Sequence, residues 1–339
     1  MTYHSGSRAM QDRVGVRDLA DHVGRAIGQG IRPVAAAFLE LQPMLVVGAA
    51  APERGAEAGG GGSGISTGPG RGFGPAVPGG GSGSEDDAVP GSGTGSGSGA
   101  ISGNGGVWAS LLTGRPGFVR ATGPHQMSVA GGLRAGDPLT DALATPGTPV
   151  GTIALDPRTR RRMRLNGRVR PTPRGFAVEA DQVFANCPKY LQKREVYETV
   201  DRAAGVSRSG TELTSSQREF VEAADTFFLA TVHPHGADAS HRGGNPGFVR
   251  VDAPGELSWR DYTGNAMFLT LGNLAADPRA GLLFLDWTSG AVLQLTGTAR
   301  TEFTPDGERT VRFTLAEAVE TPAASPLRWS APAYSPANP

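Results

Sequence analysis

Short apolar runs separated by turn residues fill the second half of the chain. Within 292–300, Leu293 and Leu295 alternate with polar residues, which is the two-residue period of a half-buried strand. Six further runs are expected to be strands: 227–232, 237–240, 247–251, 256–259, 267–271 and 280–287. Short strands at this spacing, broken by turns that contain Gly and Pro, are typical of an all-β barrel. The pattern therefore predicts a mainly β fold with short helices.

Few helices are expected. Ser216 followed by Glu219 is a capping-box pattern, which predicts a helix start. Pro33 suits the first turn of an equivalent helix earlier in the chain. The other predicted helices are 16–27, with Leu19, Val23 and Ile27 on one face, a bridging helix over 189–204, and one turn over 273–278. The final segment, 321–339, is rich in proline, and we expect it to be draped over the surface or disordered.

Two parts of the chain match each other at fixed offsets. The sequence Pro-Gly-Phe-Val-Arg occurs at 116–120 and again 130 positions later. The same offset aligns 108–110 with 238–240, 151–156 with 281–286, and Gly167 with Gly297. Further upstream the offset is 182, and it aligns 38–39 with 220–221 and 45–47 with 227–229. The chain is therefore expected to contain two tandem copies of one unit.

The difference between the two offsets, 52, is the length of a Gly- and Ser-rich segment over 55–106, of which 22 residues are Gly. Such a segment has almost nothing apolar to bury, so we expect a disordered insertion inside the first unit rather than a linker between separate domains. It falls where the second unit has a tight turn over 233–236, and hairpin tips tolerate insertions. The expected division is a helical extension (1–31), unit one (32–188), a helical connector (189–213), unit two (214–320) and a Pro-rich tail (321–339).

The overall composition excludes several function classes. The formal net charge is zero, so nothing global favours nucleic acid or a membrane surface as a partner. Cys187 is the only cysteine, so neither an intrachain disulfide nor a Cys-based zinc site is available within the chain. The first residues lack the apolar core of a signal peptide, and no apolar run has the length of a membrane span. These features predict a cytoplasmic protein.

Several motifs occur in an order that points to a known family. They are Asn-Cys-Pro-Lys-Tyr at 186–190, Ser-His-Arg-Gly-Gly at 240–244, Gly-Asn-Ala-Met-Phe-Leu-Thr-Leu-Gly-Asn-Leu at 264–274, Asp-Pro-Arg-Ala-Gly-Leu-Leu-Phe at 277–284 and Gln-Leu-Thr-Gly-Thr-Ala at 294–299. In this arrangement the chain resembles the pyridoxamine 5'-phosphate oxidase-like, FMN-binding split-barrel superfamily, in particular its bacterial flavin-nucleotide-binding branch. The resemblance implies six-stranded barrels that pair face to face with FMN in the groove between them. Two such units in one chain are expected to form that pair internally, as a pseudo-dimer.

The candidate cofactor-binding residues lie mainly in unit two. An FMN phosphate needs cationic and hydrogen-bonding groups on a rigid backbone. Ser240, His241, Arg242 and Gly243 fit this need, and the resemblance places a second group beside the flavin: Thr270, Leu271, Gly272 and Asn273. Unit one has Leu111 and Leu112 where unit two has His241 and Arg242. Three arginines on one face of a unit-one strand are possible anion contacts across the groove, with a solvated outer face as the alternative: Arg160, Arg162 and Arg164.

The resulting hypothesis is an FMN-dependent oxidoreductase that moves hydride or electrons between NADPH or NADH and an unknown acceptor. The flavin carries this chemistry, so no catalytic side chain is singled out. Vitamin B6 oxidation is not expected, because the substrate-side Arg and His pattern of that reaction is missing. The alternatives are a flavin or haem carrier or sensor, with haem less favoured than FMN, and a partner-binding protein whose site has decayed. No metal site is expected, because no acidic or Cys partner is near His233, His235 and His241.

Overall fold

The computed structural model describes residues 3–52 and 105–339. Most of this part of the chain forms two large antiparallel sheets with a few short helices around them, so the predicted mainly β split-barrel fold is confirmed. The predicted insertion over 55–106 lies almost wholly outside the described residues. No helix within the described ranges is both long and apolar enough to cross a bilayer.

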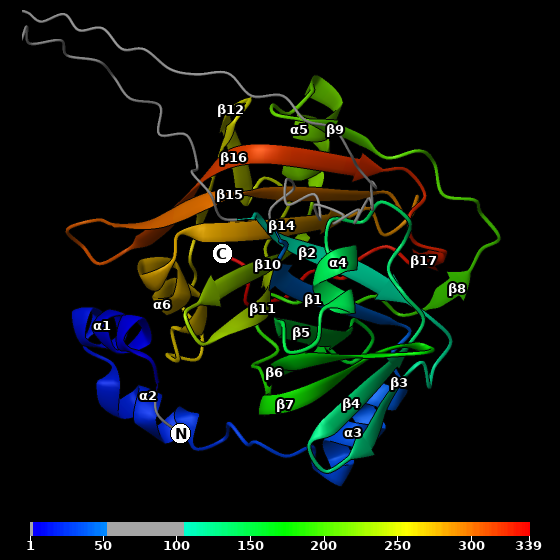
Figure 1. The fold of residues 1–339 in the computed structure, drawn as a ribbon. Helices are drawn as coiled ribbons and strands as arrows, with labels where there is room; N and C mark the ends of the chain where they lie inside the picture. The colour runs from blue at the N-terminus through cyan, green and yellow to red at the C-terminus, as the bar shows by residue number, and fades with distance from the viewer. Residues whose placement is uncertain (1–2, 53–104) are drawn as a thin grey trace, which may run out of the picture. The chain divides into compact units, whose positions relative to one another are not determined.

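The first sheet, here called the first barrel, contains seven strands. They are β1 (Met44–Ala50), β2 (Val107–Thr113), β3 (Val119–Gly123), β4 (Gln126–Ala130), β5 (Pro149–Asp156), β6 (Arg161–Thr172) and β7 (Gly175–Ala185). Their order in the sheet is β2-β1-β5-β6-β7-β4-β3 (Figure 1). Strands β1 and β2 pair up to Ala50 and Val107, so the chain leaves and re-enters the sheet at the open end of one hairpin.

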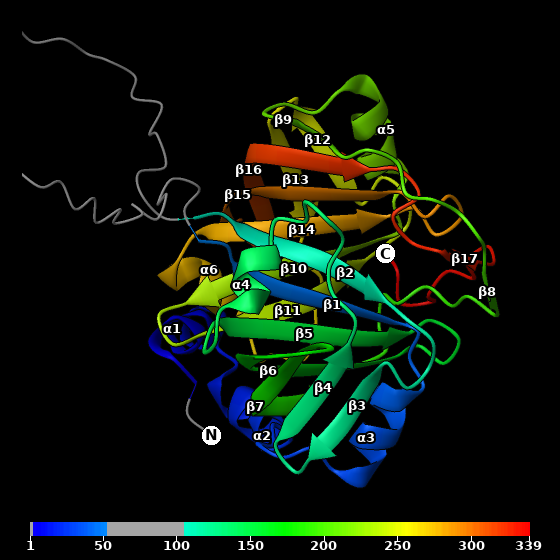
Figure 2. The same cartoon turned by 45° about the vertical axis from the view of Figure 1, so that its right-hand side comes forward.

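The second sheet, the second barrel, repeats this plan. Its main strands are β10 (Thr226–His233), β11 (Gly236–Gly243), β12 (Val249–Ala253), β13 (Glu256–Arg260), β14 (Arg279–Leu285), β15 (Val292–Phe303) and β16 (Arg309–Thr321), with β9 (Arg208–Gly210) added beside β16. Their order, β11-β10-β14-β15-β16-β13-β12, matches the first barrel strand for strand (Figure 2). The correspondence follows the sequence offsets of 182 for β1 and 130 for β2 to β6. The last strand has a larger offset, because Ala180 of β7 lies opposite Gly167 whereas Leu315 of β16 lies opposite Gly297.

Two equivalent positions of the barrels require glycine for the same structural reason. The pairing register shifts at Gly167 in β6 and at Gly297 in β15, so both mark a β-bulge. A Cβ atom at Gly167 would lie 1.9 Å from the carbonyl oxygen of Glu179, and one at Gly297 would lie 2.0 Å from that of Thr314. Only glycine fits at either position, which explains why this match recurs in the sequence.

The two barrels pack against each other through the outer faces of their sheets. Gly151 of β5 lies against the backbone of Asp238 in β11, and Gly281 of β14 lies against that of Trp108 in β2, so close approach occurs twice in symmetric positions. Phe228 is among the fully buried residues of the apolar cluster between the sheets. Each barrel also has its own apolar core. Burial of a large apolar side chain contributes roughly 1.5–3 kcal/mol, so this shared cluster stabilises the internal pair.

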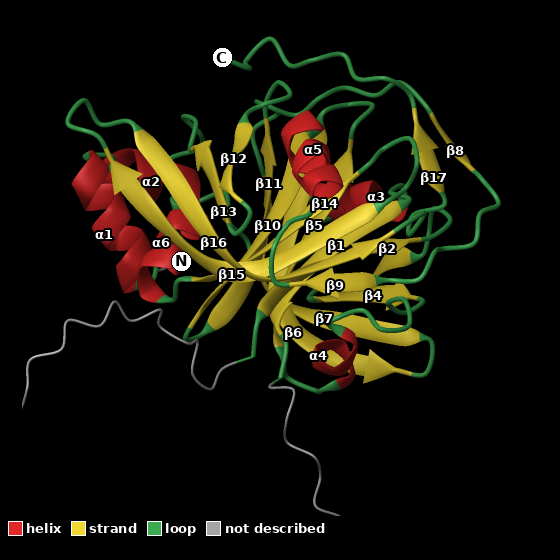
Figure 3. Ribbon diagram, turned by 90° about the horizontal axis from the view of Figure 1, so that it is seen from above, coloured by secondary structure: helices red, strands yellow, loops and turns green. Residues whose placement is uncertain are grey.

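In residues 3–52 and 105–339, six helices lie around the sheets. They are α1 (Ser5–Val14), α2 (Arg17–Gly24), α3 (Pro33–Glu40), α4 (Thr140–Ala144), α5 (Ser215–Ala223) and α6 (Leu269–Ala276). Helix α1 lies beside α6, and α2 lies next to α1 (Figure 3). The predicted helix over 16–27 corresponds to the shorter α2, in which Leu19 is 53% exposed while Ala20 is fully buried. Of the other residues expected on the face of Leu19, Val23 is partly buried and Ile27 is buried beyond the end of the helix. Ala20 faces inward because α2 packs closely against Tyr3, whose hydroxyl donates to the Ala20 carbonyl.

Three other local predictions differ from the structure. Helix α5 is capped by Thr214 with Gln217, two residues before the predicted box, because Thr214 and Gln217 satisfy each other's backbone N–H groups. The apolar run over 267–271 is not a strand, since α6 begins at Leu269. The run over 267–271 pairs with no strand of the described sheets. Its apolar residues Leu269 and Leu271 are buried as part of helix α6 instead.

The predicted bridging helix over 189–204 is also wrong. This segment is extended and contains β8 (Tyr197–Thr199), which pairs with β17 (Leu327–Trp329) of the C-terminal segment. Tertiary contacts override helix propensity here: Arg194 and Asp225 form a buried ion pair at 2.7 Å, and Trp329 packs against Tyr197. The C-terminal segment is therefore extended, as expected, and part of it is packed into the cluster between the barrels.

Candidate functional site

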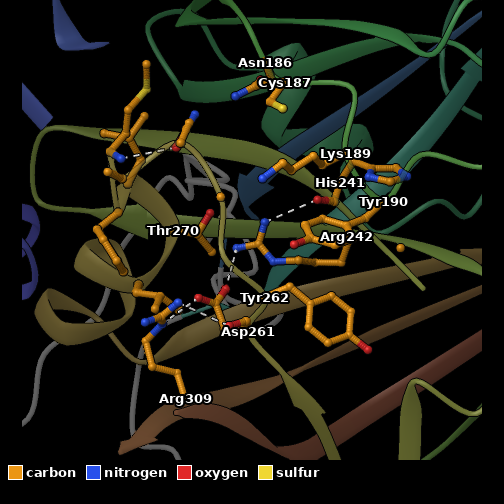
Figure 4. A pocket seen from close by; sticks show the side chains of 18 of the residues that line it. Asn186, Cys187, Lys189, Tyr190, His241, Arg242, Asp261, Tyr262, Thr270 and Arg309 are labelled. Atoms are coloured by element: carbon orange, nitrogen blue, oxygen red, sulfur yellow. Dashed lines mark hydrogen bonds and ion pairs between the residues drawn. The ribbon is translucent and has the colours of Figure 1, made fainter. Parts of the chain in front are cut away.

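A cavity of about 110 Å³ lies where the two barrels meet. The first barrel contributes two side chains of β6 and the segment over 186–190 that follows β7. The second barrel contributes the end of β11, residues 259–262 at the end of β13, the loop over 264–268 and the start of α6. Figure 4 shows side chains from both barrels converging on this space. The sequence prediction of a groove site between the units is consistent with this position.

The arginines of β6 reach the second barrel because alternate residues of a strand share one face. Arg164 is buried and forms an ion pair of 2.8 Å with Asp238 of β11, whose other carboxylate oxygen accepts a hydrogen bond of 3.0 Å from Asn166. Arg162, two residues before Arg164, points the same way but contacts the end of β11. The polar side chains on this face of β6 therefore contact strand β11 of the second barrel.

Arg162 carries a positive charge without a negative partner. Its Nη1 atom donates to Nδ1 of His241 at 2.6 Å, and its Nη2 atom donates to the carbonyl oxygen of Cys187 at 2.6 Å. Among the described residues no carboxylate forms an ion pair with it. Burial, and then the neighbouring charges of Arg164 and Arg242, lower the pKa of the Arg162 guanidinium to about 9. A cation held this way is stabilised by any anion that enters the cavity.

His241 is neutral and has a defined tautomer. Burial, followed by the charges of Arg162, Arg242 and Arg164, lowers its pKa well below the ordinary value. Since a guanidinium can only donate, Nδ1 of His241 must be the acceptor, and the proton lies on Nε2. That Nε2 atom is buried and has no hydrogen-bond partner. His241 therefore holds an unused N–H donor in the wall of the cavity.

The remaining charges of the wall do not balance. Of the described residues that line the cavity, one is acidic, Asp261. Six are cationic: Arg162, Arg164, Lys189, Arg242, Arg260 and Arg309. Asp261 is shared, at 3.7 Å from Arg242 and 3.1 Å from Arg309 (Figure 4). Arg164 pairs with Asp238, and Arg260 pairs with Glu308. Within the described chain, Arg162 and Lys189 have no acidic partner, so the cavity has surplus positive charge.

Unsatisfied polar atoms concentrate in the same wall. Twelve buried side-chain nitrogen or oxygen atoms of the described residues lack a hydrogen-bond partner, and six of them belong to residues that line this cavity. These six are Nε of Arg162, Arg164 and Arg242, Oδ1 of Asn186, Nε2 of His241 and Nε1 of Trp259. Buried polar groups in native proteins are nearly always hydrogen-bonded, and each orphan costs about 1–3 kcal/mol. Five of the six are N–H groups, which suit a ligand rich in acceptor atoms.

Part of the same lining is apolar, and the backbone there is strained. Phe248, Trp259, Met267 and Phe268 give it an apolar surface. Ala266 and Phe268 have φ values of 60° and 54°, which residues other than glycine rarely adopt. Such conformations cost about 1–3 kcal/mol each and persist only where the surrounding structure enforces them. The loop over 264–268 is thus held in an unfavourable backbone conformation against the cavity.

The N-terminal helices hold this loop in place. Gln11 of α1 donates a buried hydrogen bond of 2.9 Å to the carbonyl of Met267. Met267 and Leu269 also belong to an apolar cluster with Tyr3 and Ala20. Helix α1 approaches α6 closely, since a Cβ atom at Gly272 would lie 2.5 Å from the backbone of Ser7. The N-terminal extension therefore forms the outer support of the cavity.

The structure brings together seven of the predicted site residues in the cavity wall: Arg162, Arg164, His241, Arg242, Gly243, Thr270 and Leu271. Ser240 lies behind the wall, where its hydroxyl is 3.3 Å from that of Thr270. Gly272 and Asn273 face away from the cavity; Asn273 contacts Thr231 and His4. Arg160 points to the C-terminal segment and donates to the carbonyl of Ala333. The roles of all these residues in cofactor binding remain predictions.

Several wall residues were not predicted as site residues. Asp261, Tyr262, Trp259 and Arg309 follow or end strands, and no local motif marks them. Cys187 is partly buried, and the segment around it lines the cavity. His233 and His235 lie apart from the cavity: His233 stacks on His4 at 4.6 Å. No group of three or more His, Cys, Asp or Glu side chains in the described ranges is arranged to hold a metal ion.

The second barrel matches a known protein family. Residues 213–329 match the family model described as pyridoxamine 5'-phosphate oxidase. The match covers about a third of the chain and supports the expected superfamily. The matched range includes β11, the loop over 264–268 and α6, and so most of the cavity wall. No curated protein matches the chain.

Solved structures that are similar to this chain cover about a third of it. The FAD binding protein from Mycobacterium smegmatis is 11% identical and covers 34% of this chain and 98% of its own, with a TM-score of 0.24. General stress protein 26 from Bacillus anthracis is 9% identical and covers 28% and 83%, with a TM-score of 0.23. A NimC/NimA family protein from Clostridium acetobutylicum is 14% identical and covers 31% and 84%, with a TM-score of 0.25.

Proposed function

We propose that the chain is a flavoprotein that binds FMN in the cavity between its barrels and transfers hydride or electrons between NADPH or NADH and an acceptor. The observation that carries this proposal is the set of cationic side chains and unsatisfied donors in a lining that also contains aromatic side chains. An aromatic ring system that carries a phosphate complements both kinds of side chain. The family match over 213–329 supports a flavin as this ligand.

The residues have distinct roles in this proposal. Arg162, Lys189 and Arg242 would neutralise the phosphate, since charge-assisted hydrogen bonds to Arg are strong and directional. His241 would donate from Nε2, and it stays neutral because its pKa is well below the ordinary value. The aromatic side chains would exclude water from the ring system. When bound, FMN supplies the redox chemistry, so the protein needs no general acid or base in this wall.

The two halves of this site come from what we infer to be a duplication, because the strand orders of both barrels agree. The expected location remains the cytoplasm. A carrier or sensor without turnover is separated from an enzyme by its kinetics. Reduction of bound flavin by NADPH or NADH, followed at its visible absorption band in a stopped-flow instrument, is expected for the enzyme. A flavin that binds but is not reduced by either nucleotide would contradict the redox part of the proposal alone.

The binding part is tested by the visible absorption spectrum of the purified protein after incubation with FMN. A two-band flavin spectrum is expected, and a sharp Soret band would indicate haem instead. Arg242→Ala should weaken FMN binding roughly 10- to 150-fold, since hydrogen bonds to charged groups contribute about 1.5–3 kcal/mol. Arg250→Ala is the matched control, because Arg250 is exposed on β12 and pairs only with Asp252. Equal FMN affinity in the two variants would contradict the assignment of Arg242.

A further inference from the structure

The shared strand order gives every residue of the cavity a counterpart in the other barrel. His241 pairs with Phe228 and Leu111 pairs with Val46, which are equivalent positions under the two sequence offsets. In the same way Arg162 corresponds to Val292, and Arg164 to Gln294. The pair of barrels thus contains two equivalent places for a ligand, of which only one has been described so far.

The counterpart place is nearly closed. Its residues line a space of only about 20 Å³, and they include Leu111, Val292 and Gln294. The three cationic or polar side chains that define the first cavity are here replaced by two apolar ones and one amide. Ser207 of the connector bonds Thr321 at the end of β16, with 2.8 Å between their hydroxyl oxygens, and both residues border the space. Connector and second barrel together cover what would be its opening.

A hydrogen-bond network fills the interior of this counterpart. Gln294 of the second barrel donates through Nε2 to the carbonyl of Ala109 at 2.9 Å and lies 3.0 Å from the Ser110 hydroxyl of the first barrel. Ser110 donates to Asp137 Oδ1 at 2.6 Å, and the backbone N–H of Leu139 donates to the same oxygen at 2.9 Å. The second oxygen of Asp137 lies 3.5 Å from Gln294 Nε2.

This network is complete without a ligand. None of the orphaned buried atoms in the described chain belongs to a residue that lines the counterpart, whereas six belong to the wall of the first cavity. The counterpart also places an acid, Asp137, where the first cavity has Met267. This carboxyl group offers no cation to an anionic ligand, unlike the arginines of the first cavity.

We propose that the chain has a single ligand site, and that the equivalent place has become a polar joint, formed by Ser110, Asp137 and Gln294, that fastens one barrel to the other. The number of ligands rests on the proposed flavin function. The joint itself does not, because all of its partners are protein atoms. The two parts can therefore be tested separately on the full-length protein.

The number of sites is measured with FMN as the probe, by equilibrium dialysis against a known concentration of active protein. One FMN per chain is expected. Two FMN per chain would overturn the proposal. No bound FMN would refute the proposed flavin function and leave the joint to be decided by the second experiment.

The joint is tested by a double-mutant cycle with Ser110→Ala, Gln294→Leu and both together, followed by thermal unfolding without FMN. Each single change is expected to lower Tm by roughly 3 to 8 °C, since each leaves a buried partner unsatisfied. The double variant should lose clearly less than the sum of the two, because the residues share one network. Additive losses would overturn the joint. Gln29→Leu, an exposed position, is the control and should leave Tm unchanged.

Discussion

Replacing Arg162 with Met removes the unpaired charge of the cavity but keeps a long, unbranched side chain. In the wild-type protein the pKa of Arg162 is lowered to about 9 by burial and by two neighbouring arginines. At about 1.4 kcal/mol per pKa unit, the protein destabilises the charged form by several kcal/mol, and the partial exposure of the side chain reduces this cost. The substitution also removes the hydrogen bonds to His241 and Cys187, worth about 1 kcal/mol each.

The balance favours the variant in the absence of ligand. A net gain on the order of 1–2 kcal/mol is expected, which raises Tm by roughly 2 to 6 °C for a chain of this size. Binding should change in the opposite direction. Loss of a charge-assisted contact should weaken FMN binding roughly 10- to 150-fold. A residue that destabilises the empty protein while it strengthens ligand binding is the signature of a site held ready for an anion.

Both quantities are measured on the same ligand-free preparation, by calorimetric unfolding and then by titration with FMN. Arg170→Met is the matched control, because Arg170 lies at the exposed end of the same strand, outside the cavity, and pairs with Glu179. The control should change neither affinity nor, by more than about 1 °C, the Tm. If Arg162→Met melts at or below the wild-type temperature and binds FMN equally well, the electrostatic account of the cavity is refuted.

Three further predictions follow from other parts of the fold. Burial lowers the pKa of His233 to about 4, so the unfolded chain binds more protons than the folded one between about pH 4 and 6.5. The free energy of unfolding, measured with urea, should therefore rise with pH across that window. His233→Gln should flatten this rise, whereas the control His22→Gln should not. Deletion of 53–104 leaves four residues, 51–52 and 105–106, between β1 and β2, so Tm should be unchanged or higher. A fall of more than about 5 °C would contradict the hairpin account. Gly272→Ala should lower the free energy of unfolding by about 1–3 kcal/mol, because the added methyl group pushes α1 away from α6. The control Gly255→Ala has open space around it and should lower it little. Equal losses in chemical denaturation would refute the close approach of these helices.

Local sequence patterns predicted most of the barrel but not its cross-chain contacts. The repeat and the alternating runs anticipated two similar β units, and β16 was missed although Val311, Phe313 and Leu315 alternate clearly within it. The connector was mistaken for a helix because its extended form depends on pairing with the C-terminal segment, far away in sequence. Local periodicity contains no information about such a partner.

The candidate site shows the same limit. The arginines of β6 and the motif at 240–244 were predicted separately, as possible contacts and as a phosphate site. The hydrogen bond from Arg162 to His241 joins residues 79 positions apart on different barrels, and a single sequence does not reveal such a pair. Nor does any motif indicate that Asp261 is shared by Arg242 and Arg309, because this depends on how β13 and β16 meet.

Both walls of the cavity belong to one polypeptide, since the extended segment over 189–213 runs from one barrel to the next. Two separate barrels would come apart on dilution, and any site between them would be lost below their dissociation constant. A covalent connection replaces that equilibrium with an effective concentration in the millimolar range for a short flexible linker. The affinity of the cavity for its ligand should therefore be the same at nanomolar and at micromolar protein, and the barrels should not exchange partners between molecules.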